Sequence, residues 1–529
     1  MDRIDQLVDA FMAHHFAFFP IDATFMGFPG HDHRLPPADL DAPAREATGI
    51  AALQAQLAGI SAPPRGGPAL DVKLMRAALA HAARALAERP RFRDPTWYVG
   101  EAAFGLISLM LPLAVAPTSD ALAARLSAIP HFLASAKVHL AGAEVARDWV
   151  VRGQKEIRAA QRLLQGRLQL HRLWQPSMTP AVDAALVAFA EFDRLIAVLP
   201  DADPRCGTDY LAFIMRDVHA LPFGPGEAEA MAIERCARVK EELAAMAAKL
   251  EPGRSWKEQI ADLHKICPAP DKIVDTYRAL HEQAMEMAAE LMTPATEYGL
   301  DFKPLPDWAE GIAGDLYFLS YRSPTVVEAG LGSVYWTSPP GQSAANIKST
   351  HAVHHGSIGH HTQNTRSRAA PSRLARLANT GTSRCISFLS GGTMGEGWAC
   401  YAQDLMMEVS GFYSPAELLA AKSNELRNAS CLIADIRLHT RRYTLEEMRQ
   451  FYRDEAGFPA ERTWGETVKN SIVPGVRLMY WLGTEAIKDA RARWSGDART
   501  FHDALLDRGH VAISWAIEDL GTAPRTAAG

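Results

Sequence analysis

Residues 346–365 read NIKSTHAVHHGSIGHHTQNT and place five of the chain's 19 histidines within eleven positions: His351, His354, His355, His360 and His361. Imidazole is the commonest transition-metal ligand, and it is the only side chain that titrates near neutral pH without help from its surroundings. The cluster therefore predicts a metal site around which the rest of the chain is organised. The alternative is a histidine-rich helix and loop in which the rings only fill the core or hold hydrogen bonds.

The spacing of the histidines limits which of them can share an ion. Two imidazoles share a metal only when their nitrogens approach to about 3 to 3.5 Å, because metal–nitrogen bonds are about 2.0 to 2.1 Å long. His351 and His355 lie four apart and share one face of a helix, whereas His354 and His360 lie six apart and point about 120° away from each other. The second pair converges only if the backbone is distorted, which the two intervening glycines permit. The spacing alone does not decide which of the two pairs binds the ion.

A third ligand is expected from a carboxylate. Two histidines and one carboxylate form the ligand set of hydrolytic zinc enzymes and of non-haem iron enzymes. The sequence GGTMGEGWACYAQDL at 391–405 predicts a helix that is led in by glycines and carries Glu396 in its first turn. Glu396 is therefore the carboxylate that we expect beside the histidines.

Composition excludes several classes of protein. Hydrophobic residues make up 48% and charged residues 22% of the chain, as in soluble globular proteins. The net charge is −6 and the basic residues are scattered, so we expect no nucleic acid partner. The longest apolar run, 106–117, is too short to cross a bilayer, so we expect no membrane segment. The N-terminus has no secretory signal pattern and the six cysteines form no CxxC pair, which favours a cytoplasmic protein.

The remaining sequence predicts a mostly α protein. Apolar residues recur at helical spacing over 69–199, with breaks expected at five prolines: Pro90, Pro95, Pro117, Pro130 and Pro176. Strand patterns occur only within 298–342, where we expect a small β-hairpin near 312–338. Four side chains of this region are candidates to line a cleft: Tyr317, Tyr321, Arg322 and Tyr335. We predict one large helical domain, 1–529, with an N-terminal helical part (1–300) and a part that carries the metal site and cleft (301–529).

Several motifs resemble one bacterial family. HHGSIGHHTQ at 354–363 resembles the HEAYPGHHLQ-type signature of the domain of unknown function 885 family, which is distantly similar to gluzincin metallopeptidases and carboxypeptidase Taq. GEGWACYAQDLMMEVSGFY is similar to the family's EGWAxYxExLxxExGxY, and RNASCLIADIRLHTRRYTLEEM to its RAxRLVVDxGLHxxxWTxEEA. WGETVKNSIVPGVRLMYWLG and PIDATFMGFPGHDHRLP resemble its late Pro-Gly segment and its N-terminal segment. The resemblance covers nearly the whole chain.

The resemblance implies a helical fold around a deep cleft, peptidase-like hydrolysis, and metal ligands at His354, His360 and Glu396. In that scheme the residue after the first histidine is a glutamate that serves as general base. His355 stands at that position here. Other departures fall in the motifs that should line the cleft: Gln403, Arg437, Lys469 and Asn470.

Because this sequence differs from the family motifs at these positions, we expect other side chains to take the catalytic roles. His355 is predicted to replace the glutamate as base, and His361 to act as a second acid or oxyanion donor. His439 and Tyr480 match the family pattern and are candidates to contact a substrate carboxylate or a developing oxyanion. Alternatively His355 joins the metal, in which case three histidines and a glutamate favour iron, manganese or nickel and a lyase or oxidative reaction.

The leading hypothesis is a metal-dependent hydrolase that cleaves an amide bond in a small-molecule or short-peptide substrate. Zinc is the expected divalent ion, and iron or manganese are the alternatives. The competing hypotheses are a non-hydrolytic metalloenzyme and an inactive homologue that keeps the cleft as a binding module. A homodimer is left open.

Overall fold

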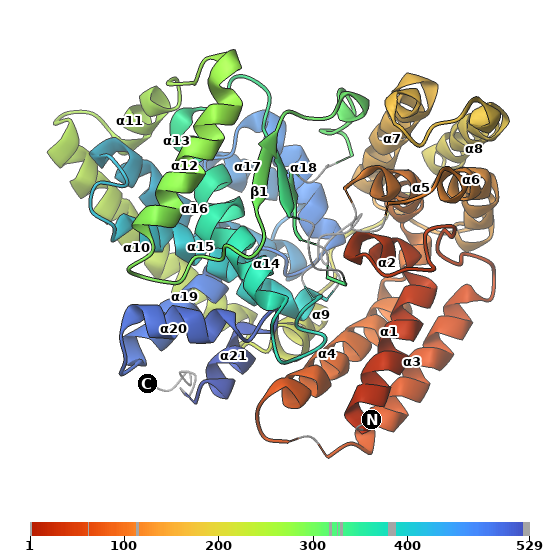
Figure 1. Ribbon diagram of the computed structural model, residues 1–529, viewed down its shortest axis with the longest axis horizontal. Helices are drawn as coiled ribbons and strands as arrows, with labels where there is room; N and C mark the ends of the chain where they lie inside the picture. The colour runs from red at the N-terminus through yellow and green to blue at the C-terminus, as the bar shows by residue number, and fades with distance from the viewer. Residues whose placement is uncertain are drawn as a thin grey trace.

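The computed structural model describes residues 3–61, 63–112, 116–316, 320–324, 326–327, 332–378 and 388–521. These residues form a mostly helical body with a small three-stranded sheet, which confirms the predicted fold class (Figure 1). No helix among them combines the length and the apolar character needed to cross a bilayer.

Helices make up the first part of the chain, from the N-terminus to residue 287. They are α1 (Arg3–Phe18), α2 (Pro20–Met26), α3 (Ala42–Ala58), α4 (Gly67–Glu88), η1 (Arg91–Arg93), α5 (Pro95–Met110), α6 (Ser119–His139), α7 (Arg147–Arg162), η2 (Leu163–Arg167), η3 (Leu168–Leu170), η4 (Pro176–Met178), α8 (Thr179–Ala197), α9 (Thr208–Phe213), η5 (Ile214–Val218), α10 (Pro225–Leu250), α11 (Trp256–Leu263), η6 (Pro270–Lys272) and α12 (Ile273–Met287). Helices α1 to α8 occupy one side of the molecule in Figure 1, and α10 to α12 lie on the other.

Helix α5 is the centre of the core on the N-terminal side. Every one of its residues is buried, because it is apolar all round and α2, α6 and α7 pack against it. Pro95 begins this helix, where a missing N–H costs nothing, and the side chain of Asp94 caps it by accepting from the backbone N–H of Thr96. The break expected at Pro130 is wrong, since α6 continues through that residue. A proline within a helix removes one hydrogen bond, and the packing of α6 against α5 and α8 outweighs that loss.

The second part of the chain carries the sheet and the remaining helices. They are β1 (Leu300–Lys303), η7 (Asp307–Ala309), β2 (Tyr321–Arg322), β3 (Ser333–Trp336), α13 (Ala344–Asn346), η8 (Ile347–His355), η9 (Ser357–His361), α14 (Thr362–Ser367), η10 (Leu389–Gly391), α15 (Gly392–Met407), α16 (Pro415–His439), α17 (Leu445–Asp454), α18 (Ala460–Ile472), α19 (Leu478–Arg493), α20 (Ala498–Leu506) and α21 (Ile513–Asp519).

The sheet has the strand order β1-β3-β2. β2 and β3 are antiparallel, with Tyr321 opposite Tyr335, and they lie within the region where a hairpin was predicted. β1 runs parallel to β3 and precedes that region, so it was missed; its sequence LDFK is too short to give a strand pattern. All of β3 is buried, and Tyr335 lies in an apolar cluster with Tyr277 of α12 and Ile347 of η8. The sheet thus holds one side of the histidine segment in place.

Helix α15 lies at the centre of the second part of the chain. It makes its most extensive packing with α19, where a Cβ built on Gly397 would come within 2.6 Å of the Gly483 backbone. Only glycine allows two helices to approach this closely. The indole N–H of Trp398 donates to the carbonyl of Ile358 over 2.8 Å, which ties α15 to η9. Glu396 is therefore fixed relative to the histidine segment.

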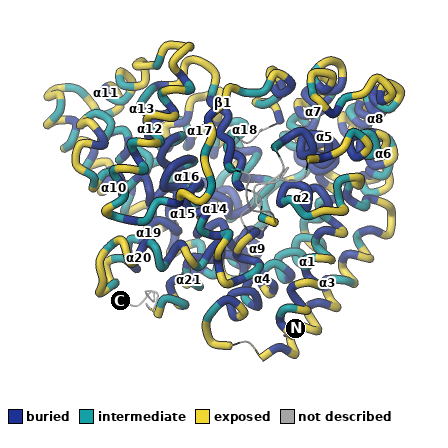
Figure 2. Tube along the Cα trace, viewed as in Figure 1, coloured by how far each residue is buried: buried dark blue, intermediate teal, exposed yellow. Residues whose placement is uncertain are grey.

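The two parts of the chain share their apolar cores. One cluster joins Leu7 of α1 and Leu74 of α4 to Trp398 of α15 and Phe501 of α20. In Figure 2 the trace is mostly buried at α15 and mostly exposed along the outer helix α3.

Candidate metal centre

His354, His360 and Glu396 come together in the structure. One ligand atom from each lies within 4.8 Å of the other two. The Nε2 atoms of His354 and His360 are each 3.6 Å from Glu396 Oε2. Two donors of a tetrahedral ion with bonds of about 2.0 to 2.2 Å stand about 3.3 to 3.6 Å apart, so the three side chains can close on one metal ion with little movement.

The backbone between the two histidines is bent, as their spacing requires. His354 is the last residue but one of η8, and His360 belongs to η9. Both segments are π-helices, which are wider than an α-helix, and a kink at Gly359 interrupts the second (φ −80°, ψ −124°). A Cβ on Gly359 would come within 2.0 Å of the His354 carbonyl oxygen, and one on Gly356 within 2.8 Å of the Ala352 carbonyl. Neither position has room for a side chain. The glycines therefore allow the fold that brings the two imidazoles onto one side.

Glu396 approaches from α15. The helix begins at Gly392, so Glu396 lies in its second turn and not in the first turn that the glycine pattern predicted. The helix N-terminus consequently contributes less to its charge than we expected. Burial opposes ionisation of Glu396, but hydrogen bonds and charge from His354 and His360 outweigh it and hold the pKa of the carboxyl well below its usual value.

Gln403 orients His354 through the ring nitrogen Nδ1, the one that does not face Glu396. Its Oε1 lies 3.2 Å from His354 Nδ1, and its amide nitrogen donates to Ser349 Oγ over 2.8 Å, which fixes the direction of the amide. An amide turned this way accepts from a proton on His354 Nδ1, which would leave the lone pair of Nε2 for a metal ion. Such an outer contact sets the tautomer of a metal-binding histidine. Gln403 fulfils this role although it departs from the acidic residue of the family motif.

His355 borders the group without belonging to it. Among the described residues, the set of close ligand atoms contains His354, His360 and Glu396 but not His355. The Tyr335 hydroxyl lies 3.0 Å from His355 Nδ1 and 2.6 Å from His351 Nδ1. Burial lowers the pKa of His355 well below its usual value, and the neighbouring histidines lower it further. His355 is thus a neutral ring held by a tyrosine beside the three close side chains.

Two of the predicted catalytic histidines have both ring nitrogens engaged inside the protein. His361 Nε2 donates to the carbonyl of Tyr298 and Nδ1 accepts from the Ser333 hydroxyl, each over 3.1 Å. His439 Nε2 donates to the carbonyl of Asn470 over 3.1 Å, and Nδ1 accepts from the Cys206 N–H over 3.3 Å. Both rings are buried and have no free nitrogen to offer a substrate. Their predicted roles as acid or oxyanion donor do not fit this geometry.

Tyr480 lies beside Glu396. Burial raises the pKa of its phenol well above the usual value, and the charge of Glu396 and a hydrogen bond with that carboxylate raise it further. The Arg477 guanidinium lies 5.2 Å from the centre of the Tyr480 ring. A neutral phenol lies beside Glu396 here, and the predicted contact of Tyr480 with a substrate carboxylate or an oxyanion stays a prediction.

The chain matches the profile of one family, described as "Bacterial protein of unknown function (DUF885)", over residues 20–516. The protein belongs to the DUF885 family. Two solved structures share its fold and are described as a "putative lipoprotein of unknown function from Shewanella oneidensis" and a "putative lipoprotein from Colwellia psychrerythraea". They are 18% and 15% identical to it, with TM-scores of 0.78 and 0.79. Each alignment covers 98% of this chain, and 100% and 99% of the other. No curated protein matches this member of the DUF885 family.

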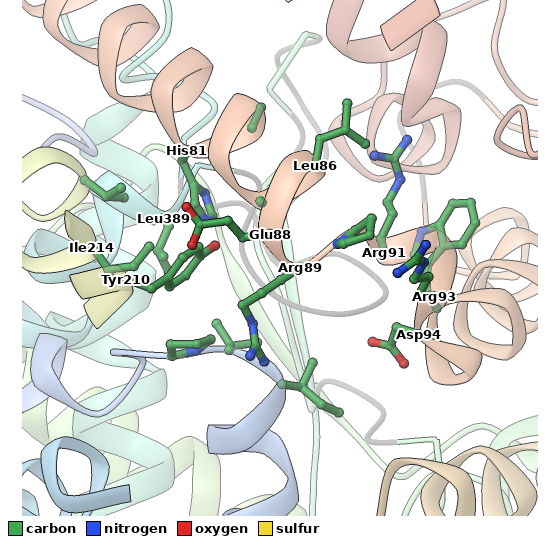
Figure 3. Close-up of a pocket in the computed structure, with 18 of the residues that line it drawn as sticks. His81, Leu86, Glu88, Arg89, Arg91, Arg93, Asp94, Tyr210, Ile214 and Leu389 are labelled. Carbon is green, nitrogen blue, oxygen red and sulfur yellow. The ribbon is translucent and has the colours of Figure 1, made fainter. Parts of the chain in front are cut away.

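A cavity of ≈ 520 Å³ lies near the start of α15 in this DUF885 protein. His81 and Arg89 line one side together with Tyr210 and Leu389, and Arg91, Arg93 and Asp94 line the other (Figure 3). The three ligand residues do not line it. Ser390 does, and it lies six residues before Glu396, or roughly 9 Å at 1.5 Å per residue. The cavity therefore ends close to the helix that carries the metal ligand.

The cleft candidates of the 298–342 region are mostly packed against other residues. Tyr335 and Arg322 are buried, and the Arg322 guanidinium donates to the carbonyl of Phe25. The Tyr321 hydroxyl lies 3.4 Å from Ser333 Oγ. Tyr317 lies outside the described residues. Two of the four contact the histidine cluster: the Tyr335 hydroxyl lies beside His351 and His355, and the Tyr321 hydroxyl lies 3.5 Å from His361 Nδ1.

The sequence interpretation missed the contacts that support the ligands. Gln403 and Cys400, whose Sγ lies 3.9 Å from His354 Nδ1, both lie on α15. They are seven and four residues beyond Glu396, which places all three on one helical face. Helical spacing from Glu396 was therefore a signal that could have identified them.

Proposed function

We propose that this protein is a metal-dependent hydrolase that cleaves an amide bond in a small peptide or peptide-like molecule. The observation that carries the proposal is the group formed by His354, His360 and Glu396. Catalytic zinc sites use three protein ligands of this kind and keep a fourth position open for water or substrate. The resemblance of the histidine motif to gluzincin metallopeptidases points to the same chemistry.

Zinc is the ion that this donor set fits best. Two imidazoles and one carboxylate also suit iron or manganese, so the metal has to be identified by measurement. A zinc ion held here would polarise the carbonyl of a substrate and activate a water molecule. The orientation of His354 by Gln403 and the buried position of Glu396 support a preformed site.

His355 is the group that we assign to proton transfer. Its Nδ1 contacts the Tyr335 hydroxyl, and no described residue is hydrogen-bonded to its Nε2. The ring lies next to both ligands, with its centre 4.9 Å from that of His354 and 6.0 Å from that of His360. A positioned base contributes about 10² to 10⁴ in rate, and the low pKa of this histidine favours the lower end of that range. Tyr480 donates a hydrogen bond to the developing oxyanion.

The cavity beside α15 supports a small substrate. Its volume of ≈ 520 Å³ is in the range of pockets that hold a ligand of a few hundred daltons. Aromatic rings and paired charges line it, which suits a peptide-like molecule better than a long polymer. A cytoplasmic location and the absence of nucleic acid and membrane partners stay predictions. The sequence also allows a homodimer.

Metal analysis combined with anomalous diffraction at the absorption edge tests the proposal. We expect one zinc ion per chain, bound by His354, His360 and Glu396, and hydrolysis of a panel of dipeptides and N-acyl amino acids. Replacing any one of the three ligands by alanine is expected to abolish both. Full hydrolysis after such a change would rule the proposal out.

One observation favours a second candidate function. His355 stands where the related peptidases have a glutamate, and its low pKa makes it a weak base. The second candidate is therefore a non-hydrolytic metalloenzyme of small-molecule metabolism that uses iron or manganese. Iron at full occupancy, with turnover that requires dioxygen or a reductant, would select it. A chain that takes up no metal would instead be an inactive homologue that binds small molecules.

A further inference from the structure

Three arginines converge on a single aromatic ring close to the metal group. The guanidinium carbons of Arg427, Arg462 and Arg477 lie 5.5, 5.2 and 5.9 Å from the centre of the Phe458 ring. They come from α16, α18 and the turn before α19, so the fold gathers them from three separate segments. We call these three side chains the arginine cluster. Like charges gathered in this way repel each other unless an anion lies between them.

The cluster holds more positive charge than its partners neutralise. Glu466 pairs with both Arg462 and Arg477, at 2.9 Å from Arg462 Nε. Arg427 donates only to uncharged acceptors, the carbonyl of Ala456 at 3.2 Å and Asn424 Oδ1 at 3.4 Å. Among the described residues, three guanidinium groups thus form ion pairs with one carboxylate, so positive charge is in excess within the cluster.

Donor groups of the cluster also remain unused. Arg477 is only 8% exposed, and its Nε has no hydrogen-bond partner. No described residue accepts from Arg427 Nη2 or from the two terminal nitrogens of Arg462. Burial lowers the pKa of Arg427, and the charges of Arg462 and Arg477 lower it further. The side chain of Arg462 is 60% exposed, so the cluster opens to solvent.

The other acidic group near the cluster does not compensate for this charge. The backbone N–H of Arg477 donates to Asp435 Oδ2 over 3.0 Å, so that contact does not involve the guanidinium. Burial raises the pKa of Asp435 to about 7, so its carboxyl carries only part of a negative charge near neutral pH. Cys431 and Tyr452 also face the cluster, and burial raises the pKa of both groups, which keeps them neutral.

The cluster lies next to the metal group. The Arg477 guanidinium is 5.2 Å from the centre of the Tyr480 ring, and Tyr480 in turn interacts with Glu396. Asn428, the residue after Arg427, donates to Cys400 Sγ over 3.3 Å, and Cys400 contacts His354. One phenol ring therefore separates the surplus charge from the bond that would be cleaved.

We propose that the arginine cluster binds a free carboxylate of the substrate, located within about one residue of the amide bond that is cleaved. The inference rests on the proposed hydrolase function for its position, and it adds the substrate class: N-acyl amino acids and short peptides with a free C-terminal carboxylate. A guanidinium offers two parallel N–H groups that match a carboxylate, and such charge-assisted hydrogen bonds are strong. Arg462, at the exposed edge, contacts the carboxylate first, and Arg427 and Arg477 form the inner wall.

Binding of matched probes tests this inference without turnover. We would titrate the metal-loaded protein calorimetrically with N-acetyl-L-leucine and with its neutral amide, which differ only in the carboxylate. The acid is expected to bind at least about tenfold more tightly, because a hydrogen bond to a charged group contributes about 1.5–3 kcal/mol. Arg462→Gln and Arg462→Glu are expected to remove this preference while the affinity for the amide stays the same.

Arg238→Gln is the matched control, because Arg238 is an exposed arginine paired with Glu234 on α10, outside the arginine cluster. It is expected to leave both affinities unchanged. Equal binding of acid and amide by the unaltered protein would overturn the inference, as would inorganic phosphate that binds at the cluster more tightly than the acid. A preference for the acid that depends on Arg462 would support it even if no hydrolysis were found, so the two proposals fail separately.

Discussion

His360 and His361 are neighbours in the chain, yet the fold assigns them to opposite roles. His360 turns Nε2 toward Glu396 at 3.6 Å, whereas His361 uses both nitrogens in hydrogen bonds to Tyr298 and Ser333. Burial lowers the pKa of His361 to about 3, so its ring stays neutral and structural. The comparison teaches that the partners of the second nitrogen, and not the density of histidines, decide which ring is free to bind a metal.

The largest expected effect comes from replacing His360 and His361 by alanine, one at a time. His360→Ala is expected to lose stoichiometric metal and at least about 10³-fold in hydrolysis, since a catalytic ion contributes several kcal/mol. Elemental analysis and initial rates measure both quantities.

His361→Ala is the matched partner of that variant. It is expected to keep the metal but to lower the free energy of unfolding by about 3 kcal/mol, because it leaves a cavity and removes two hydrogen bonds of the buried ring. Urea unfolding measures the loss. Retention of metal by His360→Ala together with its loss in His361→Ala would reverse the assignment of the two residues.

Much of this arrangement could be predicted from the sequence, and the rest could not for physical reasons. The mostly helical fold could be predicted, and α16 (415–439) shows why: a capping serine and recurring apolar residues mark this helix in the sequence. The ligand set followed from the motif and from the two glycines. The structural role of His361 could not be predicted, because its partners lie 63 and 28 positions away in the chain. The arginine cluster was missed for the same reason, since its members come from three segments.

Restoring a glutamate at position 355 is expected to have the second largest effect. His355→Glu places a carboxylate where the signature that the histidine motif resembles has a glutamate, and a general base contributes about 10² to 10⁴ in rate. Hydrolysis of N-acyl amino acids is expected to rise toward that range if the metal group is otherwise competent. Steady-state kinetics on a panel of such substrates measures the change. An unchanged or lower rate at full metal occupancy would show that the site does not perform hydrolysis.

Removing the acceptor behind His354 is expected to have a smaller effect. Gln403→Leu leaves Nδ1 of His354 without its partner at 3.2 Å, and the loss of such outer contacts costs about 10- to 100-fold in metal affinity. Competition with a chelator measures the affinity. Gln403→Glu keeps an acceptor in place and is expected to bind metal at least as tightly as the unaltered protein. Equal affinity of all three proteins would show that the contact does not orient the ring.

The smallest expected effect concerns His502, a histidine outside the metal group whose contacts resemble those of His361. His502 Nδ1 donates to the Leu291 carbonyl over 2.7 Å, Nε2 accepts from the Tyr401 hydroxyl over 2.8 Å, and burial lowers its pKa to about 4. Between about pH 6.5 and 4 the unfolded chain binds a proton at this residue and the folded chain does not, so stability falls as pH falls. One such group contributes a slope of at most about 1.4 kcal/mol per pH unit. His502→Gln is expected to reduce the measured slope by this amount in urea unfolding between pH 6.5 and 4.5. An unchanged slope would mean that the ring is protonated in the folded protein, and that engaged nitrogens alone do not keep a buried histidine neutral.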